Sequence, residues 1–469
     1  MNIIGREEEI ETLRDCYDSN RSEFVAIYGR RRIGKTYLIK ELFGEGFTFY
    51  ATGLPDEANT VQLTAFNAEI ARSCNNELPV ANNWFEAFEN LNVIVERSTK
   101  NRKIIFLDEI PWMAANKSDF LTGLDYFWNR WASSRKDVFL IISGSAASWM
   151  IDNIINNTGG LHNRLTRQIA LQAFTLRECE QYFASRRIPM TRYQIAEAYM
   201  IFGGVPFYLS LFDPKFSLYQ NVDRIYFSAK AELGDEFENL YRSLYKNADN
   251  YISVIEALAQ NGNGMTRNDI YSALKKKDGG SLTRILKNLV QSGFVREYIK
   301  YGQKKKDSLY QLIDQFSMFD IKFRDKRKEY SRDFWLKNSA TPAHAAWSGF
   351  AFEKLCLLHI PQILKKLGIT GVLTSVFSWR GGDEEKAQID LVIDRYDKVI
   401  NLCEMKYSSD EYTIDKKYSE ALRHKRGIFV NSTGTKKYAQ TTLITTYGLK
   451  RNAYSEEITS RIELDDLFE

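Results

Sequence analysis

Cysteine is scarce in this sequence of 469 residues, and the few thiols are scattered along it. No C-x-x-C pair and no Cys/His cluster occurs, so the sequence offers no zinc site of the usual spacing. An odd number of scattered cysteines fits reduced thiols in a cytoplasm best. The cysteines are Cys16, Cys74, Cys179, Cys356 and Cys403.

An excess of charge and a long apolar run are missing as well. There are 64 lysines and arginines against 60 acidic residues, a net charge of only +4, so any basic surface for nucleic acid must be local. No apolar run approaches the ~20 residues of a membrane span. Residues 1–11 lack the apolar core of a signal peptide. We therefore expect a cytoplasmic globular protein without a membrane segment, built from three or four domains.

The strongest motif that is present lies at residues 24–36, FVAIYGRRRIGKT. It reads as a buried strand, then G-x-x-x-x-G-K-T, then a helix, which is the context that a phosphate-binding P-loop requires. Two glycines let backbone N–H groups converge on phosphate oxygens, and the helix N-terminus adds positive charge. Lys35 can reach the β- and γ-phosphates of ATP, and Thr36 can ligate Mg²⁺. The predicted contacts are Gly29, Arg30, Arg31, Arg32, Ile33, Gly34, Lys35, Thr36 and Tyr37.

A second apolar run at residues 103–107 ends in Asp108 and Glu109. The pattern predicts a parallel strand whose carboxylates lie at the edge where ligands bind in α/β sheets. Asp108 lies 73 residues after Lys35, a usual spacing in this class, and could hold Mg²⁺ through water. Glu109 could polarise the water that attacks ATP. The alternative is a buried strand followed by an acidic loop.

Two further residues are candidates for sensing phosphate. Ser143 follows a predicted strand at 138–142 and could contact the γ-phosphate, although small residues also suit a tight turn. Arg164 could reach a phosphate of its own or of a neighbouring subunit, which leaves a homo-oligomer open, or it could be a surface arginine. We treat the lone His162 as structural.

These motifs, in this order, resemble the archaeal-type P-loop ATPases, an AAA-like branch close to the STAND ATPases that is also widespread in bacteria. The resemblance covers residues 1–240 and implies an ATPase core with a helical lid that places Pro206 near the nucleotide. Asn163 departs from the glycine usual before the arginine. The motifs are GREEE from Gly5, GRRRIGKT from Gly29, IIFLDE from Ile104, ISGS from Ile142, the pair Asn163-Arg164 and GGVPFYL from Gly203.

Residues 247–320 predict a winged helix-turn-helix. Helical patterns at 251–259, at 267–274 and from Ser281 precede a β-ribbon at 296–314, which is the order of that motif. Lysines at 275–277 and 304–306 could neutralise DNA phosphates. A winged helix with a structural or protein-binding role is an equal alternative.

The C-terminal segment carries a second chemical pattern. Glu353 lies in an apolar helix, Asp390 in the second of three predicted strands, and Glu404 and Lys406 in the third. Alternate residues of a strand share a face, and buried carboxylates are costly without partners. Asp390 and Glu404 could therefore ligate Mg²⁺, with Glu353 completing the site and Lys406 orienting water.

This arrangement resembles the PD-(D/E)XK nuclease superfamily, and a helix at 418–425 with a strand at 427–430 also matches that pattern. Archaeal-type ATPases often carry such a C-terminal domain. An exposed Glu404–Lys406 ion pair and a nuclease fold that has lost activity are the alternatives.

We thus expect an α/β protein: a P-loop NTPase parallel sheet with a helical lid, a winged helix and a mixed α/β nuclease-like domain. The predicted domains are 1–174, 175–246, 247–320, a linker at 321–345 and 346–469. ATP with Mg²⁺ would control a nuclease that acts on nucleic acid, and the winged helix favours DNA. The alternatives are a regulatory ATPase that binds DNA or protein without cutting and a nucleotide switch with negligible turnover.

Overall fold

The structure is a computed structural model that describes residues 3–75, 77–115, 117–156, 159–161, 163–274, 279–303, 307–327, 333–339, 341–381 and 387–469. It divides into two compact units, which are Met1–Ala173 with Arg242–Lys246, and Phe174–Tyr241 with Asn247–Glu469. No helix among the described residues is long and apolar enough to cross a membrane. His162 and the two predicted lysine clusters at 275–277 and 304–306 lie outside the described residues.

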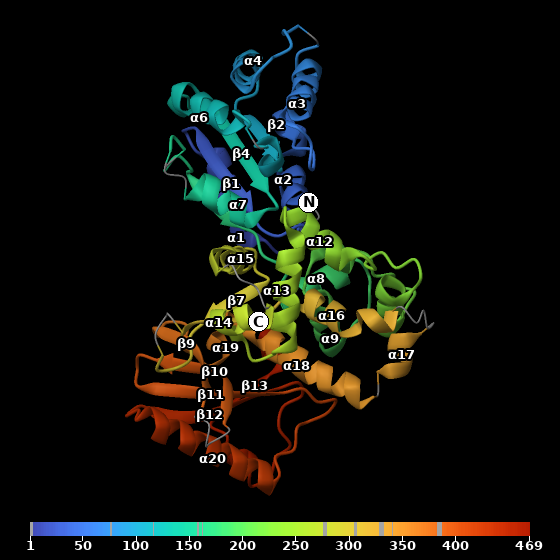
Figure 1. The fold of residues 1–469 in the computed structure, drawn as a ribbon, viewed down its shortest axis with the longest axis vertical. Coiled ribbons are helices and arrows are strands. Elements are labelled where there is room, and N and C mark those ends of the chain that lie inside the picture. Colours follow the sequence, from blue (N-terminus) through green and yellow to red (C-terminus); the bar gives the residue numbers. More distant parts are fainter. Residues whose placement is uncertain are drawn as a thin grey trace. The chain divides into compact units, whose positions relative to one another are not determined.

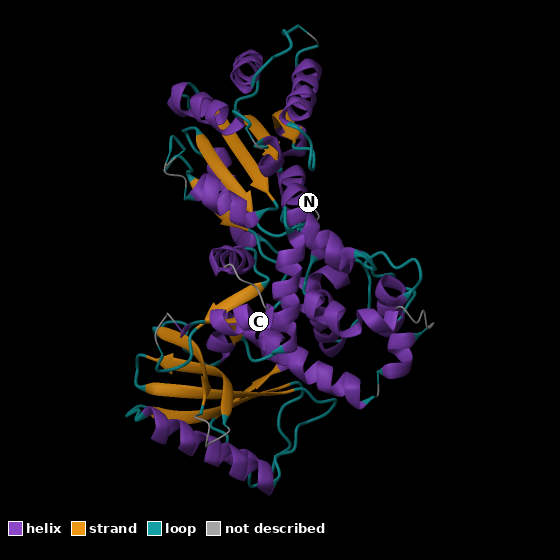
Figure 2. Ribbon diagram, viewed as in Figure 1, coloured by secondary structure: helices purple, strands orange, loops and turns teal. Residues whose placement is uncertain are grey.

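The first unit is built on a five-stranded parallel sheet in the order β2-β3-β4-β1-β5. Figure 2 draws its strands in orange among purple helices. The apolar runs predicted as strands from the sequence are confirmed, whereas β2 was not predicted. Because β4 lies between β1 and β3, the P-loop strand and the acidic strand are not neighbours. The strands are β1 (Glu23–Tyr28), β2 (Phe47–Thr52), β3 (Lys103–Asp108), β4 (Val138–Gly144) and β5 (Arg167–Ala170).

Helices cover both faces of this sheet (Figure 1), so its central strands β1, β3 and β4 are buried on both sides. In β1, Phe24 and Ala26 belong to an aromatic-rich core cluster, while Val25 and Ile27 belong to a second cluster. That division follows from the alternation of side chains along a strand. Helices α3, α4 and α6 supply the first cluster, and α1 and α2 the second. The helices of this unit are α1 (Glu7–Asp18), α2 (Lys35–Phe43), α3 (Asn59–Ser73), α4 (Trp84–Arg97), α5 (Ile110–Met113), α6 (Phe120–Arg130) and α7 (Ala147–Met150).

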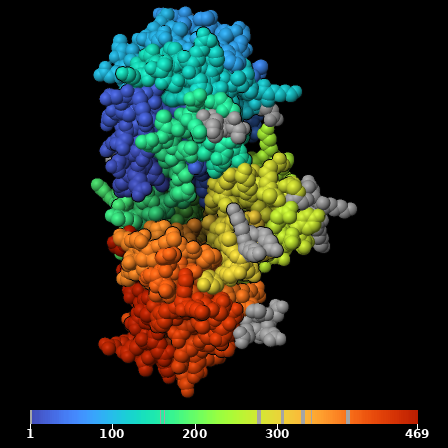
Figure 3. All heavy atoms as spheres, turned by 90° about the vertical axis from the view of Figure 1, so that its left-hand side faces the viewer, coloured from blue at the N-terminus to red at the C-terminus, as the bar shows by residue number. Residues whose placement is uncertain are grey.

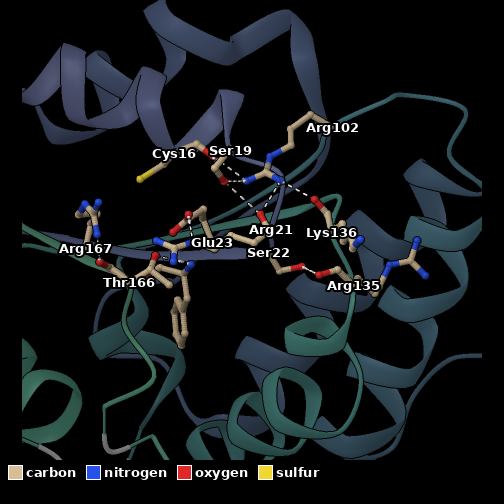
Figure 4. Close-up of polar contacts among 11 residues, drawn as sticks. Cys16, Ser19, Arg21, Ser22, Glu23, Arg102, Arg135, Lys136, Thr166 and Arg167 are labelled. Carbon is tan, nitrogen blue, oxygen red and sulfur yellow. Dashed lines mark hydrogen bonds and ion pairs between the residues drawn. The ribbon is translucent and has the colours of Figure 1, made fainter.

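A buried guanidinium holds together the amino-terminal ends of β1, β3 and β4 (Figure 4). Arg102, which is 8% exposed, donates to the carbonyl oxygens of Cys16 at 2.6 Å, Arg21 at 2.8 Å and Lys136 at 2.9 Å. Burial lowers the pKa of Arg102 from its ordinary value. The hydrogen bonds offset that cost and fix the end of α1 against the strand edge opposite the P-loop.

The second unit begins with a group of helices. Helix α9 is buried throughout residues 195–202, which are apolar except for Glu197, as expected for a helix that packs on all sides. It ends at Gly203 and Gly204, whose φ angles are 67° and 65°, and Pro206 opens α10, which confirms the predicted break. These helices are α8 (Leu176–Ser185), α9 (Arg192–Phe202), α10 (Pro206–Ser210), α11 (Leu218–Val222) and α12 (Glu236–Leu244), of which residues 242–244 are counted with the first unit.

The segment predicted as a winged helix, residues 247–320 and called the winged-helix segment from here on, has three helices and a ribbon in the predicted order. The ribbon strands β7 and β8 are antiparallel, and a short strand β6 extends them into a sheet of order β6-β8-β7. One face of α15 is buried and supplies the core of this segment. The elements are α13 (Ala248–Gln260), β6 (Met265–Thr266), α14 (Arg267–Leu274), α15 (Gly279–Gln291), β7 (Val295–Tyr298) and β8 (Leu309–Leu312).

The C-terminal segment, residues 346–469, contains a mixed sheet of order β13-β12-β11-β10-β9. Strands β9, β10 and β11 pair antiparallel, and β11, β12 and β13 pair parallel. Helices α18 and α19 precede the sheet, and α20 connects β11 to β12. The elements are α18 (Pro342–Leu358), α19 (Ile360–Lys366), β9 (Thr374–Arg380), β10 (Gln388–Arg395), β11 (Val399–Lys406), α20 (Lys416–Thr433), β12 (Tyr438–Thr445) and β13 (Ser460–Glu463).

One predicted strand of this segment is wrong. Residues 427–430 continue helix α20, which ends at Gly434 with a φ of 60°, and the parallel strand is β12. Leu422 and Phe429 are both buried and lie seven residues apart, so two helical turns place them on one face. The apolar run therefore packs against the sheet as part of an amphipathic helix.

Much of the predicted linker at 321–345 is packed into the second unit. It holds the end of α16 (Gln315–Arg327) and all of α17 (Phe334–Asn338). Trp335 is 1% exposed and its ring lies 5.1 Å from Phe319 and 5.0 Å from Phe323. Of the charged residues that suggested a linker, Lys322, Asp325 and Lys326 are exposed on α16.

We expect Arg102→Met to lower the unfolding free energy of the first unit by roughly 2–4 kcal/mol, because three buried carbonyl groups lose their donor. Chemical denaturation followed by circular dichroism measures this change. Arg135→Met is the matched control, because Arg135 forms a partly exposed ion pair with Asp137 and should cost about 1 kcal/mol or less. Equal losses in the two variants would contradict a special role for Arg102.

Candidate functional site

The P-loop joins β1 to α2 and depends on two glycines. A Cβ at Gly29, where φ is 147°, would lie 2.3 Å from the carbonyl oxygen of Leu171 and 2.6 Å from the Cδ1 atom of Ile33. Gly34 has a φ of 95° and precedes the first residue of α2. The loop therefore turns tightly and directs the free N–H groups of a helix N-terminus toward the space above it.

Lys35 is 5% exposed and its ammonium lies within the loop. Its Nζ donates to the carbonyl oxygens of Gly29 at 3.0 Å and Arg30 at 3.1 Å. Burial lowers the pKa of Lys35, while the nearby carboxylates of Glu109 and Asp108 act in the opposite direction. This lysine is thus preorganised to meet phosphate charge close to the two acidic residues predicted with it.

The Asp108 carboxylate connects three of the predicted residues. Thr36 Oγ1 donates to Asp108 Oδ2 at 2.7 Å, and Ser143 Oγ donates to Asp108 Oδ1. Because β4 lies between β1 and β3, Ser143 at the end of β4 is placed beside both. A hydroxyl and a carboxylate side by side are the hard oxygen ligands that Mg²⁺ takes from proteins, with phosphates and water supplying the rest. The residues at this place therefore fit MgATP.

Glu109 is held by a residue that we did not predict. Ser145 donates to Glu109 Oε2 through both its backbone N–H and its hydroxyl, each at 2.8 Å. Glu109 itself has a φ of 52°, an uncommon conformation for a residue other than glycine. Two hydrogen bonds that orient a carboxylate beside Asp108 suit a residue that positions water. Ser145 lies in the ISGS motif, so that motif was the available signal.

The remaining predicted nucleotide contacts differ in how exposed they are and in where they lie. Ile33 is 2% exposed and belongs to the core, so its backbone is the part that can face a phosphate. Tyr37 is 50% exposed, Arg164 is exposed, and Pro206 lies in the second unit. Arg30, Arg31 and Arg32 follow Gly29 in the loop itself. The roles of these residues stay predictions.

The second predicted site lies wholly within the second unit. Burial raises the pKa of Glu353 to about 7, with further contributions from Asp390 and Glu404 that are opposed by Lys354 and Lys406. The four predicted residues therefore lie within electrostatic reach of one another, although they come from α18, β10 and β11. Their chemistry is that of buried carboxylates compensated by lysines.

A β-bulge shapes the position of Asp390. The pairing of β10 with β9 shifts between Ile389 and Val392, and the ladder of β10 with β11 starts at Leu391–Cys403. Asp390 lies in this irregularity, and Gln388 Nε2 donates to its Oδ1 at 2.6 Å. Bulges redirect single side chains at sheet edges and beside active sites, which strict alternation along the strand could not predict.

Two lysines that we did not predict contact the acidic residues. Lys425 Nζ of α20 donates to Glu404 Oε1 at 2.5 Å, and Lys354 Nζ lies 3.7 Å from Glu353 Oε2. Burial lowers the pKa of Lys354 to about 8, although Glu353 and Asp390 oppose the shift. Lys354 follows Glu353 directly, but nothing in the sequence indicated that Lys425 would meet Glu404.

The donor types of this second cluster suit a divalent cation that is also held by a phosphate. Among the residues that the structure describes, however, no group of three or more metal-ligating side chains converges. One oxygen of Glu404 is engaged by Lys425. Among the described residues of β10 and β11, Asp390 and the other oxygen of Glu404 stay available as ligands.

Comparisons with known proteins agree with the first site. Residues 3–212 match a family described as an ATPase domain predominantly from Archaea. Over 395 residues the chain is 24% identical to an uncharacterized protein of Methanocaldococcus jannaschii, covering 83% of this chain and 84% of that protein. A stretch of 39 residues, 8% of this chain, is 45% identical to 66% of an uncharacterized ATP-binding protein of the same archaeon. The solved Walker-type ATPase of Pyrococcus abyssi covers 68% of this chain and 96% of its own, at 18% identity and a TM-score of 0.50, which concerns the fold alone.

Gly29→Ala should destabilise the first unit by roughly 1–3 kcal/mol, because an alanine there takes a rare φ and collides with a backbone oxygen. Binding of a fluorescent ATP analogue should weaken in parallel, since the loop cannot keep its turn. Calorimetric unfolding and a fluorescence titration measure the two effects. Gly44→Ala is the control, because a Cβ there meets nothing within 4 Å. If Gly29→Ala changed neither stability nor binding of the analogue, the clash at Gly29 would be contradicted.

Proposed function

We propose that this chain binds ATP with Mg²⁺ and hydrolyses it at the P-loop, and the match of residues 3–212 to a family described as an ATPase domain predominantly from Archaea supports this proposal. The observation that carries this proposal is the pair of hydrogen bonds from Thr36 and Ser143 to Asp108. These two hydrogen bonds join Thr36, which follows β1 and the P-loop, Asp108 at the end of β3 and Ser143 near the end of β4. A bound Mg²⁺ would neutralise charge on the phosphates as the γ-phosphoryl leaves.

The side chains then have distinct tasks. Thr36 and Asp108 would hold the cation, and Lys35 would bind the β- and γ-phosphates with the N–H groups of the loop. Glu109, oriented by Ser145, would accept a hydrogen bond from the attacking water and align it with the γ-phosphorus. Ser143 would link Asp108 to the γ-phosphate.

We further propose that the second unit is a metal-dependent nuclease controlled by ATP, acting on nucleic acid and more readily on DNA. The support is the cluster of Glu353, Asp390, Glu404 and Lys406, which the fold brings within electrostatic reach. Asp390 and Glu404 would hold a divalent cation, which stabilises the charge that develops on the scissile phosphate. Lys406 would orient the attacking water. The division into 1–174, 175–246, 247–320 and 346–469 is part of this proposal.

A regulatory ATPase that binds DNA or protein without cutting it is the second candidate. The ion pair of Lys425 with Glu404 at 2.5 Å favours it, because an ammonium group already neutralises a carboxylate that a nuclease needs for its metal. In that case the cluster would be a charge-balanced core that stabilises the segment.

Glu109→Gln should reduce ATP hydrolysis by on the order of 10²–10⁴-fold, because the amide cannot accept a proton from water. ATP affinity should stay close to that of the wild type, since Lys35 and the loop are unchanged. Phosphate release and an ATP-analogue titration separate the two effects. Glu45→Gln serves as the control, because Glu45 is exposed. Hydrolysis that persists in Glu109→Gln would contradict the assignment of Glu109 as the residue that aligns the attacking water.

Asp390→Ala should remove cleavage of DNA in Mg²⁺ or Mn²⁺, a loss on the order of 100-fold or more when a metal ligand is lost. Linear, nicked, single-stranded and supercoiled DNA, and RNA, are tested with and without ATP. Asp397→Ala, an exposed acidic residue of the neighbouring turn, should cleave like the wild type. If the wild type cuts none of these substrates while it still binds ATP, the regulatory ATPase is the better description.

A further inference from the structure

A small pocket of about 120 Å³ lies between the winged-helix segment and the C-terminal sheet, both of which belong to the second unit. Residues of β7 and of the chain after it form one wall, and residues of β9 and β10 form the other. Its charged and polar lining includes Arg296, Tyr298, Lys300, Arg380, Gln388 and Asp390. The pocket thus reaches the same aspartate that we assign to the proposed nuclease centre.

The two walls are joined by backbone contacts and by ring packing. Tyr301 donates its backbone N–H to the carbonyl oxygen of Ser378 at 2.8 Å, and Lys300 forms a parallel bridge with Ser378. The Tyr301 ring lies 5.5 Å from Phe377 and 5.2 Å from Phe429. In Figure 3 the yellow surface of the winged-helix segment accordingly adjoins the orange and red surface of the C-terminal segment. The ribbon therefore extends the edge of the sheet at β9.

Arg296 is held in a fixed orientation within this pocket. Its Nε donates to Gln311 Oε1 at 2.6 Å, and its guanidinium lies 4.3 Å from the centre of the Tyr298 ring. Burial lowers the pKa of Arg296, while Tyr298 and Asp390 act in the opposite direction. A guanidinium that is oriented in advance loses little side-chain entropy when it binds an anion.

The charge in the pocket favours an anion over a cation. Arg296, Lys300 and Arg380 contribute three positive charges, and Asp269 and Asp390 contribute two negative ones. Gln388 donates its amide to both Asn263 Oδ1 and Asp390 Oδ1, so one carboxylate is already engaged. An anion placed beside the three cations is therefore stabilised, although Asp390 lies at the same pocket.

The volume of the pocket is enough for a single phosphate group, but not for a whole nucleotide. Sites for drug-sized ligands begin at roughly 300 Å³, so about 120 Å³ is too small for a nucleotide with its base. One phosphate of a strand that continues beyond the pocket fits both the size and the charge. Guanidinium and ammonium groups are the usual partners of such phosphates.

We infer that this pocket binds a backbone phosphate of a polynucleotide strand, held by Arg296 and Lys300 of the ribbon and by Arg380 of the sheet. This inference rests on the proposed nuclease, because it places the bound strand next to Asp390. It assigns the ribbon a role as one wall of that site. The third helix, α15, which binds DNA in many winged-helix proteins, is then not the main binding surface.

The test measures binding of the full chain to fluorescein-labelled single-stranded DNA, duplex DNA and RNA by anisotropy. EDTA is present throughout, so no cleavage interferes. Lys300→Ala and Arg380→Ala should each weaken binding roughly tenfold or more, as expected for one charged hydrogen bond. The slope of log affinity against log salt should fall by about 0.7–0.9 for each lost phosphate contact. Circular dichroism verifies that the variants fold.

Lys287→Ala is the matched control, because Lys287 is an exposed lysine on α15, and it should bind like the wild type. The inference is overturned if Lys287→Ala weakens binding while Lys300→Ala and Arg380→Ala do not. It is also overturned if the wild type binds no polynucleotide, or if inorganic phosphate competes as well as a strand does, which would indicate a site for a free anion.

Failure of this inference is distinguishable from failure of the proposed nuclease. A chain that loses affinity in Lys300→Ala and Arg380→Ala but never cuts supports the pocket and contradicts the nuclease. A chain whose cutting depends on Asp390, while both variants bind like the wild type, supports the nuclease and overturns the pocket.

Discussion

The carboxylate of Asp108 is the constraint on which the first unit depends for its chemistry. It lies at the end of β3 and accepts hydrogen bonds from Thr36 at the start of α2 and from Ser143 at the end of β4. These contacts require the strand order β2-β3-β4-β1-β5, because only a strand between β1 and β3 can place Ser143 beside both. The parallel sheet therefore does more than carry the P-loop. It brings the carboxyl ends of three strands to one point.

The opposite edge of the same sheet is held by an interaction of a different kind. Arg102 uses a buried guanidinium to satisfy the carbonyl groups of Cys16 in α1, of Arg21 before β1 and of Lys136 before β4. A buried charge is costly unless its hydrogen bonds are made, so this residue specifies how these segments meet. In open α/β sheets, ligands bind at the carboxyl ends of the strands. Here the Arg102 contacts stabilise the amino-terminal ends, away from that edge.

The second unit combines three carboxylates with several lysines in a partly buried cluster. Burial raises the pKa values of Glu353 and Glu404, and Lys354 and Lys425 compensate their charge. The same arrangement serves either a stable charge-balanced core or a site in which a cation takes over from an ammonium. The pocket beside Asp390 is lined by Arg296 of the ribbon as well as by residues of the C-terminal sheet, so both segments contribute to its walls.

The sequence by itself determined the P-loop, the strands β1, β3, β4 and β5 of its sheet, and the order of the later segments. Those signals are local, because glycine spacing and apolar periodicity depend on neighbouring residues alone. A local signal also misled, since the apolar residues 427–430 are part of α20; strand and helix cannot be told apart in so short a run. Only the tertiary structure decided that Ser145 holds Glu109, that Lys425 meets Glu404 and that Arg296 lies near Asp390. Each of these pairs joins residues that are 21 to 94 positions apart, and such contacts follow from how strands and helices pack rather than from the motif that contains either partner.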